Sequence, residues 1–339
     1  MKEEAFMNYG KRKASKKQKR ITSKKNMHKK KLGVRLFKGF LLCIFVCCIL
    51  AAIGGGFIIK HVIDNAPEIT ADSIKPQGYT STALADDGTT TIAEFTGAGA
   101  NRVYKTIDQI PEDLQHAFVA IEDSRFYKHN GIDIQGIIRA FVVGITHGGN
   151  FSEGASTITQ QLIKNNVFPD FVNESTFEEK LERKIQEQYL AIQVEKQLDK
   201  DSILESYLNT INLGQDCLGV QSAAQRYFNK DVNELNLSES ATIAAITQNP
   251  GRYNPITNPE DNARRKKVLD NMLDQGWIDQ AAHDEALADD VYSRIQNVNT
   301  RIEETNTVNS YFVDALSEQL IEDLTSEDGL GYSQTQAEN

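Results

Sequence analysis

The chain has 339 residues, a hydrophobic fraction of 40% and a formal net charge of −10. This length and this apolar content allow one large or two modest domains with a sizeable core. Three of the four cysteines lie between residues 43 and 48, and Cys217 stands alone after them, which excludes an intrachain disulfide in the rest of the chain. Neither a CxxC pair nor an HExxH motif occurs, so the sequence shows no evident zinc site.

The charge is divided unevenly along the chain. Residues 1–38 hold 15 of the 37 Lys and Arg residues and only two of the 47 acidic residues, so the remainder has 22 basic against 45 acidic residues. Between these parts, residues 39–59 form a run of 21 uncharged, mainly apolar residues. As a helix this run would be roughly 31 Å long, the thickness of a bilayer core. A cleaved signal peptide fits poorly, because the apolar run and the basic leader are both too long.

The sequence therefore predicts a single-pass anchor over residues 39–60. The excess of positive charge before it places the N-terminus in the cytoplasm and the remainder of the chain outside the cell. Residues 1–38 are then a basic cytoplasmic tail, which we expect to be disordered and to contact the anionic leaflet rather than nucleic acid.

After the anchor, residues 61–99 alternate short β-like runs with turn residues and predict a stalk with a β-hairpin that turns at Asp87-Gly88. Residues 100–290 then show helical periodicity and predict a mainly α domain. One helix is expected to start after Pro111 and another within Gly154–Asn165. Further helices are expected over residues 178–198, 201–209, 235–247, 262–274 and 281–288. Residues 291–339 turn polar before one amphipathic helix, a pattern typical of a linker that leads to a further domain.

The densest group of ionisable residues is IEDSRFYKHNG at residues 121–131, which lies between two apolar segments. A cluster of this kind is costly to hold in apolar surroundings unless its members have partners or a catalytic task. The alternative is a solvated, salt-bridged helix end, which is the usual explanation for an isolated Glu-Asp pair.

Four further stretches place polar side chains in apolar surroundings: GASTITQQLIKN, RKIQE, KDSILESYLN and QNPGRYNP. In the first of these, glycine before Ser-Thr predicts a loop that opens a helix, whose free N–H groups and hydroxyls suit an anion. Each stretch alone is equally compatible with an ordinary capped helix or loop.

Taken together, in this order and at these separations, the five stretches resemble the motifs of the family 51 glycosyltransferases. This family comprises the peptidoglycan transglycosylase module of class A penicillin-binding proteins and the monofunctional transglycosylases. The resemblance covers residues 100–290. It implies a lysozyme-like, mainly helical domain that polymerises lipid II into glycan strands with inversion and releases undecaprenyl pyrophosphate.

The same resemblance implies the residues of the site. Glu122 matches the general base, and Glu187 matches a second acidic residue at the pyrophosphate end. The expected substrate-binding residues are Asp123, Arg125, Phe126, His129, Ser156, Thr157, Gln160, Gln161, Lys164, Asn165, Arg183 and Lys184. A divalent cation such as Mg²⁺ is compatible with this chemistry, but no ligand set in the sequence requires one, and no organic cofactor is implied.

The resemblance also implies partners and a location. Lipid II, the growing glycan chain and other cell-wall synthesis proteins are the expected partners, with no nucleic acid, at the outer face of the cell membrane. The apolar segment 132–145 fits either a membrane-dipping face or a core helix. The Ser-x-x-Lys and Lys-Thr-Gly motifs of the transpeptidase domain do not occur, although residues 305–324 resemble the connector that precedes that domain.

Two other functions compete with this interpretation. A lysozyme-like hydrolase also uses paired carboxylates, but it does not explain the basic cluster at 164–184 or the anchor. A non-catalytic cell-wall scaffold does not explain why both Glu122 and Glu187 are present.

Overall fold

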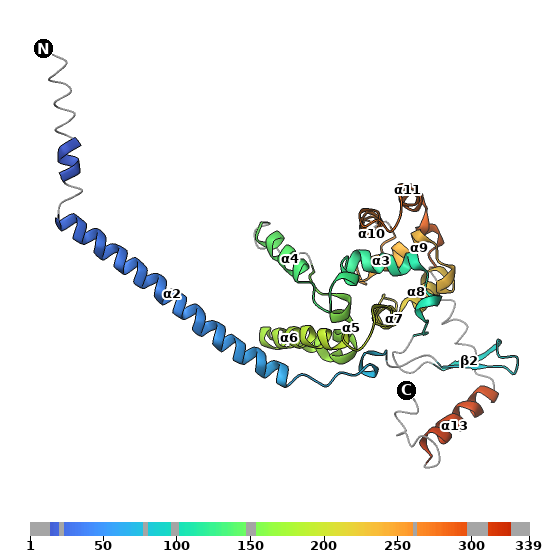
Figure 1. Ribbon diagram of the computed structural model, residues 1–339. Helices are drawn as coiled ribbons and strands as arrows, with labels where there is room; N and C mark the ends of the chain where they lie inside the picture. Colours follow the sequence, from blue (N-terminus) through green and yellow to red (C-terminus); the bar gives the residue numbers. More distant parts are fainter. Residues whose placement is uncertain are drawn as a thin grey trace. The chain divides into compact units, whose positions relative to one another are not determined.

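The computed structural model describes residues 14–19, 24–76, 81–95, 102–146, 154–259, 263–296 and 311–326. The chain divides into two compact units, residues 1–65 and 66–339 (Figure 1). Parts of the predicted tail, stalk and linker, such as residues 1–13, 96–100 and 297–310, lie outside the described residues.

The first unit contains one long helix, α2 (Lys24–Asp64), with 41 residues. Its segment from Arg35 to Asp64 is long and apolar enough to cross a membrane. The expectation of a disordered tail up to residue 38 is wrong for residues 14–19 and 24–38, which are helical. Lysine and arginine are good helix formers, so the basic segment continues the apolar helix instead of ending it.

The second unit begins with the short helix η1 (Asp72–Ile74) and the predicted hairpin, whose strands β1 (Ser81–Leu84) and β2 (Thr91–Phe95) pair antiparallel. Gly88 has φ +68°, and the Asp87 carboxylate accepts hydrogen bonds from the backbone N–H groups of Thr89 and Thr90. The hairpin and its turn are therefore confirmed.

The rest of the described unit is helical, and the mainly α prediction is confirmed. The α-helices are α3 (Glu112–Glu122), α4 (Ile134–Thr146), α5 (Ile158–Val167), α6 (Phe177–Val194), α7 (Lys200–Thr210), α8 (Val220–Phe228), α9 (Leu237–Ile246), α10 (Ala263–Asp274), α11 (Gln280–Ala288) and α13 (Tyr311–Thr325). The short 3-10 helices are η2 (Ile107–Gln109), η3 (Phe126–Lys128), η4 (Pro169–Asn173), η5 (Val232–Glu234) and η6 (Val291–Arg294).

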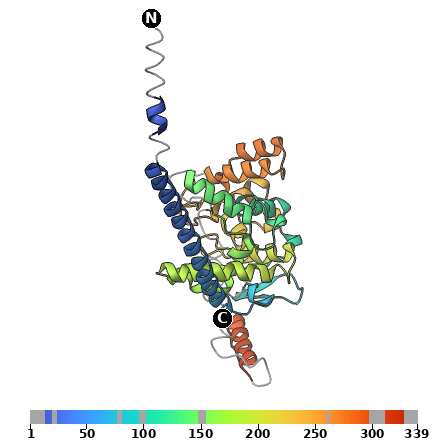
Figure 2. The same ribbon diagram turned by 60° about the vertical axis from the view of Figure 1, so that its left-hand side comes forward.

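Two groups of helices share one continuous apolar core. Helices α3, α9, α10 and α11 pack on one another, while α5 packs against α6 and α7, and α8 joins the groups through α7 and α9 (Figures 1 and 2). Phe118 of α3 and Tyr207 of α7 are both fully buried, with their ring centroids 6.1 Å apart in an edge-to-face arrangement. Helix α3 belongs to the first group and also contacts α7 of the second group through Phe118. It therefore lies at the boundary between the two groups.

Helix α8 was not predicted, because its sequence VQSAAQRYF has no side-chain N-cap and its apolar face consists largely of small residues, although Val220, Ala223, Ala224 and Tyr227 recur at helical spacing and are buried. It begins instead after Gly219, whose φ is +82° and whose added Cβ would lie 2.9 Å from the backbone of Asn209. Only glycine fits both the backbone angle and this close approach.

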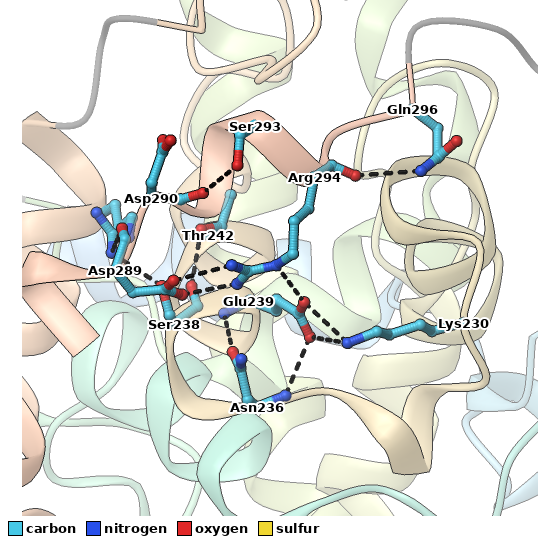
Figure 3. Close-up of polar contacts among 11 residues, drawn as sticks. Lys230, Asn236, Ser238, Glu239, Thr242, Asp289, Asp290, Ser293, Arg294 and Gln296 are labelled. Carbon is cyan, nitrogen blue, oxygen red and sulfur yellow. Dashed lines mark hydrogen bonds and ion pairs between the residues drawn. The ribbon is translucent and has the colours of Figure 1, made fainter. Parts of the chain in front are cut away.

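A buried ionic network fixes the end of the helical domain (Figure 3). The Glu239 carboxylate is fully buried and accepts hydrogen bonds from Lys230 Nζ at 2.9 Å and from Arg294 Nε at 3.0 Å. Arg294 also forms a two-pronged ion pair with Asp289. A buried charge is stable only when it is paired in this way, so the network holds η6 against α9.

A tight turn at residues 214–217 generates our first prediction. Gln215 and Asp216 have φ values of +52° and +57°, and the N–H of Cys217 donates to the Gly214 carbonyl at 2.9 Å. This left-handed pair favours glycine at its second position. We expect Asp216→Gly to raise the free energy of unfolding by about 0.5 kcal/mol and Asp216→Ala to lower it. Denaturant unfolding of both variants checks this, and a stabilising alanine would contradict the argument.

Candidate active site

Glu122 is the last residue of α3, and three side chains from different elements contact its carboxylate. Gln161 Nε2 of α5 donates to Oε2 at 3.0 Å, while Thr247 Oγ1 and Arg264 Nη2 donate to Oε1 at 2.5 and 3.0 Å. The Glu122 side chain is 14% exposed. It therefore lies partly exposed between the two helix groups and is oriented by contacts from both sides.

Two of these contacts were not predicted. Thr247 follows α9 and belongs to the fifth motif, which reads ITQNPGRYNP when the two residues before QNPGRYNP are included. Arg264 lies in the first turn of α10. A cation at a helix N-terminus opposes the helix dipole and needs an acidic partner. From this unfavourable position, a nearby acidic partner for Arg264 could have been predicted from the sequence.

Asp123, the next residue, points away from the Glu122 contacts. Its carboxylate accepts from the backbone N–H of Ile158 at 3.1 Å and lies 2.9 Å from Nε2 of His129. Both side chains are 4% exposed. Asp123 and His129 thus join the first motif to the N-terminus of α5, and this buried position favours a positioning role over direct contact with substrate.

Gly131 completes this junction through its carbonyl group. The oxygen accepts from Thr157 Oγ1 at 2.8 Å and from Gln160 Nε2 at 3.2 Å. Thr157 also caps α5 by accepting from the N–H of Gln160. Both side chains are buried, so they fix α5 in place rather than line an open surface.

The other two residues of the first motif make contacts within the protein. Phe126 is fully buried in the core, with the Lys200 ammonium 4.3 Å from its ring centroid. Arg125 donates from Nε to Asp133 at 3.0 Å, so its carboxylate partner is Asp133 and not Asp123. Burial alone would raise the pKa of Asp133, but the Gly136 N–H and Arg125 together lower it below its ordinary value.

A second charged cluster surrounds Glu187 on α6. Glu187 is fully buried, and its two oxygens accept from Arg183 Nη1 and from Lys184 Nζ, the latter at 2.6 Å. Lys184 Nζ also lies 3.2 Å from Ser156 Oγ at the start of the second motif. Arg183 bonds Glu174 as well, at 2.6 Å from Nε. The predicted site residues Glu187, Arg183, Lys184 and Ser156 are therefore linked in one set of contacts.

Lys164 of α5 lies between the two clusters. Its ammonium is 4.9 Å from the ring centroid of Phe171, and no hydrogen bond to it is present among the described residues. Burial lowers the pKa of Lys164, and the positive charge of Lys184 lowers it further, while Glu187 and Glu122 oppose the change. An amine in this position gains most from an anionic ligand. The neighbouring Asn165 is half-buried and has no contact that defines its role.

Tyr207 supports the Glu122 side of the site from within the core. Its hydroxyl lies 3.3 Å from Gln161 Oε1, which aligns the Gln161 amide with Glu122. Burial, and after it the charges of Glu122 and Asp123, raise the pKa of Tyr207 well above its ordinary value. The phenol therefore stays protonated and able to donate.

The donor set does not fit a metal ion held by the protein alone. Both oxygens of Glu187 are taken by cations, and among the described residues no group of three or more His, Cys, Asp or Glu side chains is placed to bind a metal. This geometry therefore offers no ligand set for the Mg²⁺ ion that the resemblance allows.

Comparison with known proteins agrees with this architecture. A model of the transglycosylase family matches residues 88–273, so the chain belongs to the transglycosylase family. It is similar to penicillin-binding protein 1A of Clostridium botulinum, with 37% identity over 78% of this chain and 32% of the relative. Penicillin-binding protein 1A of Escherichia coli is 40% identical over 74% of this chain and 28% of that protein. The chain thus spans about a third of the length of these curated relatives.

The junction at Gly131 generates the second prediction. Gly131 has φ +88°, and an added Cβ would lie 2.6 Å from the backbone of Ala191 on α6. We expect Gly131→Ala to lower the free energy of unfolding by about 3 kcal/mol or more, because the strain and the clash both act. Thermal unfolding checks this, with Gly154→Ala, which meets no atom within 4 Å, as the control. Equal transitions for the two variants would contradict the prediction.

Proposed function

We propose that the chain polymerises lipid II into glycan strands, with Glu122 as the general base and the Lys164–Lys184–Arg183 cluster at the leaving pyrophosphate. The observation that carries this proposal is the spacing along α5. Gln161 contacts Glu122, and Lys164, three residues later, faces the Glu187 cluster. Three residues of helix rise by about 4.5 Å, so a carboxylate and an anion site lie within the length of one substrate.

In this mechanism, Glu122 removes the proton from the 4-hydroxyl of the acceptor lipid II. The oxygen attacks the anomeric carbon of the donor glycan chain from the face opposite its pyrophosphate. The bond between that carbon and the pyrophosphate oxygen breaks with inversion, and undecaprenyl pyrophosphate carries the negative charge away. Cations placed where this charge develops lower the barrier.

The contacts of Glu122 in the free protein prepare it for this role. Arg264 forms an ion pair with the carboxylate, and Gln161 and Thr247 fix its orientation. An acceptor hydroxyl replaces one of these donors when it binds. Glu187 acts indirectly, by holding Lys184 and Arg183 in place from its buried position.

The charge of the site favours transfer over hydrolysis. A glycan hydrolase needs a second carboxylate free to act on the sugar. Glu187 is fully buried and bonded to two cations, so it is not free in this way. The cation cluster instead suits a phosphorylated leaving group, which a polymeric glycan substrate of a hydrolase does not have.

Within the described ranges one helix is long and apolar enough to span a membrane, and we propose that it does so with the basic N-terminal segment in the cytoplasm. Helix α4 supports contact with the outer leaflet. Ile134, Ile138 and Phe141 are 67%, 58% and 59% exposed, so the core-helix alternative for residues 132–145 is wrong. An apolar helix face of this kind lies favourably in a membrane interface. Other cell-wall synthesis proteins are further proposed partners.

The third prediction tests the base. Glu122→Gln keeps the size of the side chain and its contacts with Thr247 and Arg264 but removes the basic oxygen. We expect polymerisation of purified lipid II to fall by about 10²- to 10⁴-fold, measured by the length and amount of glycan product.

The same assay separates the competing functions. Release of soluble disaccharide fragments from preformed glycan by the wild type would support the hydrolase. A wild type that makes no product, or a Glu122→Gln variant as active as the wild type, would contradict the enzyme proposal.

The fourth prediction concerns α4. We expect Ile138→Asp with Phe141→Asp to reduce the binding of residues 66–339 to phospholipid vesicles by about tenfold or more, because two apolar side chains leave the interface. Vesicle co-sedimentation measures this, and Leu84→Asp on the hairpin, where Leu84 is 48% exposed, is the matched control. Unchanged co-sedimentation of the double variant would contradict membrane contact through α4.

A further inference from the structure

Helix α6 exposes large apolar side chains in its N-terminal half. Phe177 is 80% exposed and Leu181 is 47% exposed. The buried residues of α6 all lie in its C-terminal half: Gln186, Glu187, Leu190, Ala191 and Val194. The start of α6 therefore presents an apolar surface that is not covered by the described part of the chain.

These two residues share a helix face with a cation of the site. Phe177, Leu181 and Lys184 are spaced by four and three residues, so their side chains follow one another along a single face. The distance from Phe177 to Lys184 along the axis is about 10 Å. We call these three residues the α6 strip.

Lys184 connects the strip to the charged cluster. Its ammonium bonds Glu187 and Ser156, yet 41% of its side chain remains exposed. The cation therefore has one side fixed in the cluster and one side open to a ligand. An anionic group bound there has its next atoms beside Leu181.

We propose that the α6 strip binds the prenyl chain of the lipid-linked substrate, at the isoprene units next to the pyrophosphate. This inference rests on the proposed function, because it takes its occupant from that substrate. A pyrophosphate joined to a prenyl chain is an anion followed by a purely apolar segment. The strip has the same order, a cation followed by Leu181 and Phe177.

The acidic residues near the start of α6 do not oppose this occupant. Glu174 is paired with Arg183, and Glu179 accepts from the backbone N–H groups of Ser175 and Thr176 as part of the helix cap. These two charges are therefore compensated within the protein, whereas Glu178 and Glu182 are exposed to solvent. A neutral prenyl chain meets the apolar face and carries no charge for them to repel.

The experiment compares two probes on the full chain in detergent: undecaprenyl pyrophosphate and inorganic pyrophosphate. For Phe177→Ser with Leu181→Ser, we expect Kd for undecaprenyl pyrophosphate to rise about tenfold or more, with Kd for inorganic pyrophosphate unchanged. Lys184→Met should weaken both probes. Ile92→Ser, where Ile92 is an exposed apolar residue of the hairpin at 41%, should weaken neither.

Each outcome decides between explanations. If the double variant binds undecaprenyl pyrophosphate as the wild type does, the strip does not hold the prenyl chain. If its only loss is in binding to phospholipid vesicles, the strip contacts the bilayer and the inference is overturned. If wild type binds neither probe and makes no polymer, the proposed function itself fails.

A folding control keeps the test decisive. The conservative pair Phe177→Leu and Leu181→Met keeps the apolar character of the strip and should restore binding of undecaprenyl pyrophosphate. Circular dichroism of each variant checks that α6 still forms. A conservative pair that binds as weakly as the serine pair would contradict an apolar role.

Discussion

The active site depends on one junction, between the end of the first motif and the start of α5. Asp123 accepts the N–H of Ile158, and the Gly131 carbonyl accepts from Thr157 and Gln160. These bonds satisfy N-terminal groups of α5 that would otherwise be unpaired in a buried place. Because the junction fixes the rotation of α5, it decides that Gln161 faces Glu122 and Lys164 faces Glu187. The same helix thus positions both the side chain that contacts the proposed base and the cation of the proposed pyrophosphate site.

The second constraint is charge balance around a buried carboxylate. Glu187 has no exposed surface, and its cost of burial is offset by Arg183 and Lys184. With Lys164 nearby, three cations surround one buried anion and Glu174, which leaves net positive charge at the surface. That surplus is the feature that supports the proposed binding of a phosphorylated ligand. In the proposed mechanism Glu187 acts from its buried position, by holding Arg183 and Lys184 in place.

Much of the fold was predictable from the sequence, because its helices are bounded by clear signals. Pro111, the Asp87-Gly88 turn and the caps of α6 and α9 all mark element ends locally. The start of α2 and all of α8 were missed. A basic run gives no local sign that it continues an apolar helix, and α8 has no side-chain N-cap to mark its start, although its apolar residues recur at helical spacing. The motif resemblance identified the charged residues, but not which of them are buried. Asp123, Phe126 and His129 stand next to Glu122 in sequence and yet point into the protein, which only the packing of α5 and α7 decides.

The most direct test of the central claim is the structure of the full chain bound to an unreactive lipid II analogue. The account predicts the pyrophosphate within hydrogen-bond distance of Lys164 and Lys184, and the acceptor hydroxyl within hydrogen-bond distance of Glu122. It also predicts that Asp123 and His129 stay paired and do not touch the ligand. A pyrophosphate bound away from α5, or an acceptor hydroxyl held by a residue other than Glu122, would contradict it.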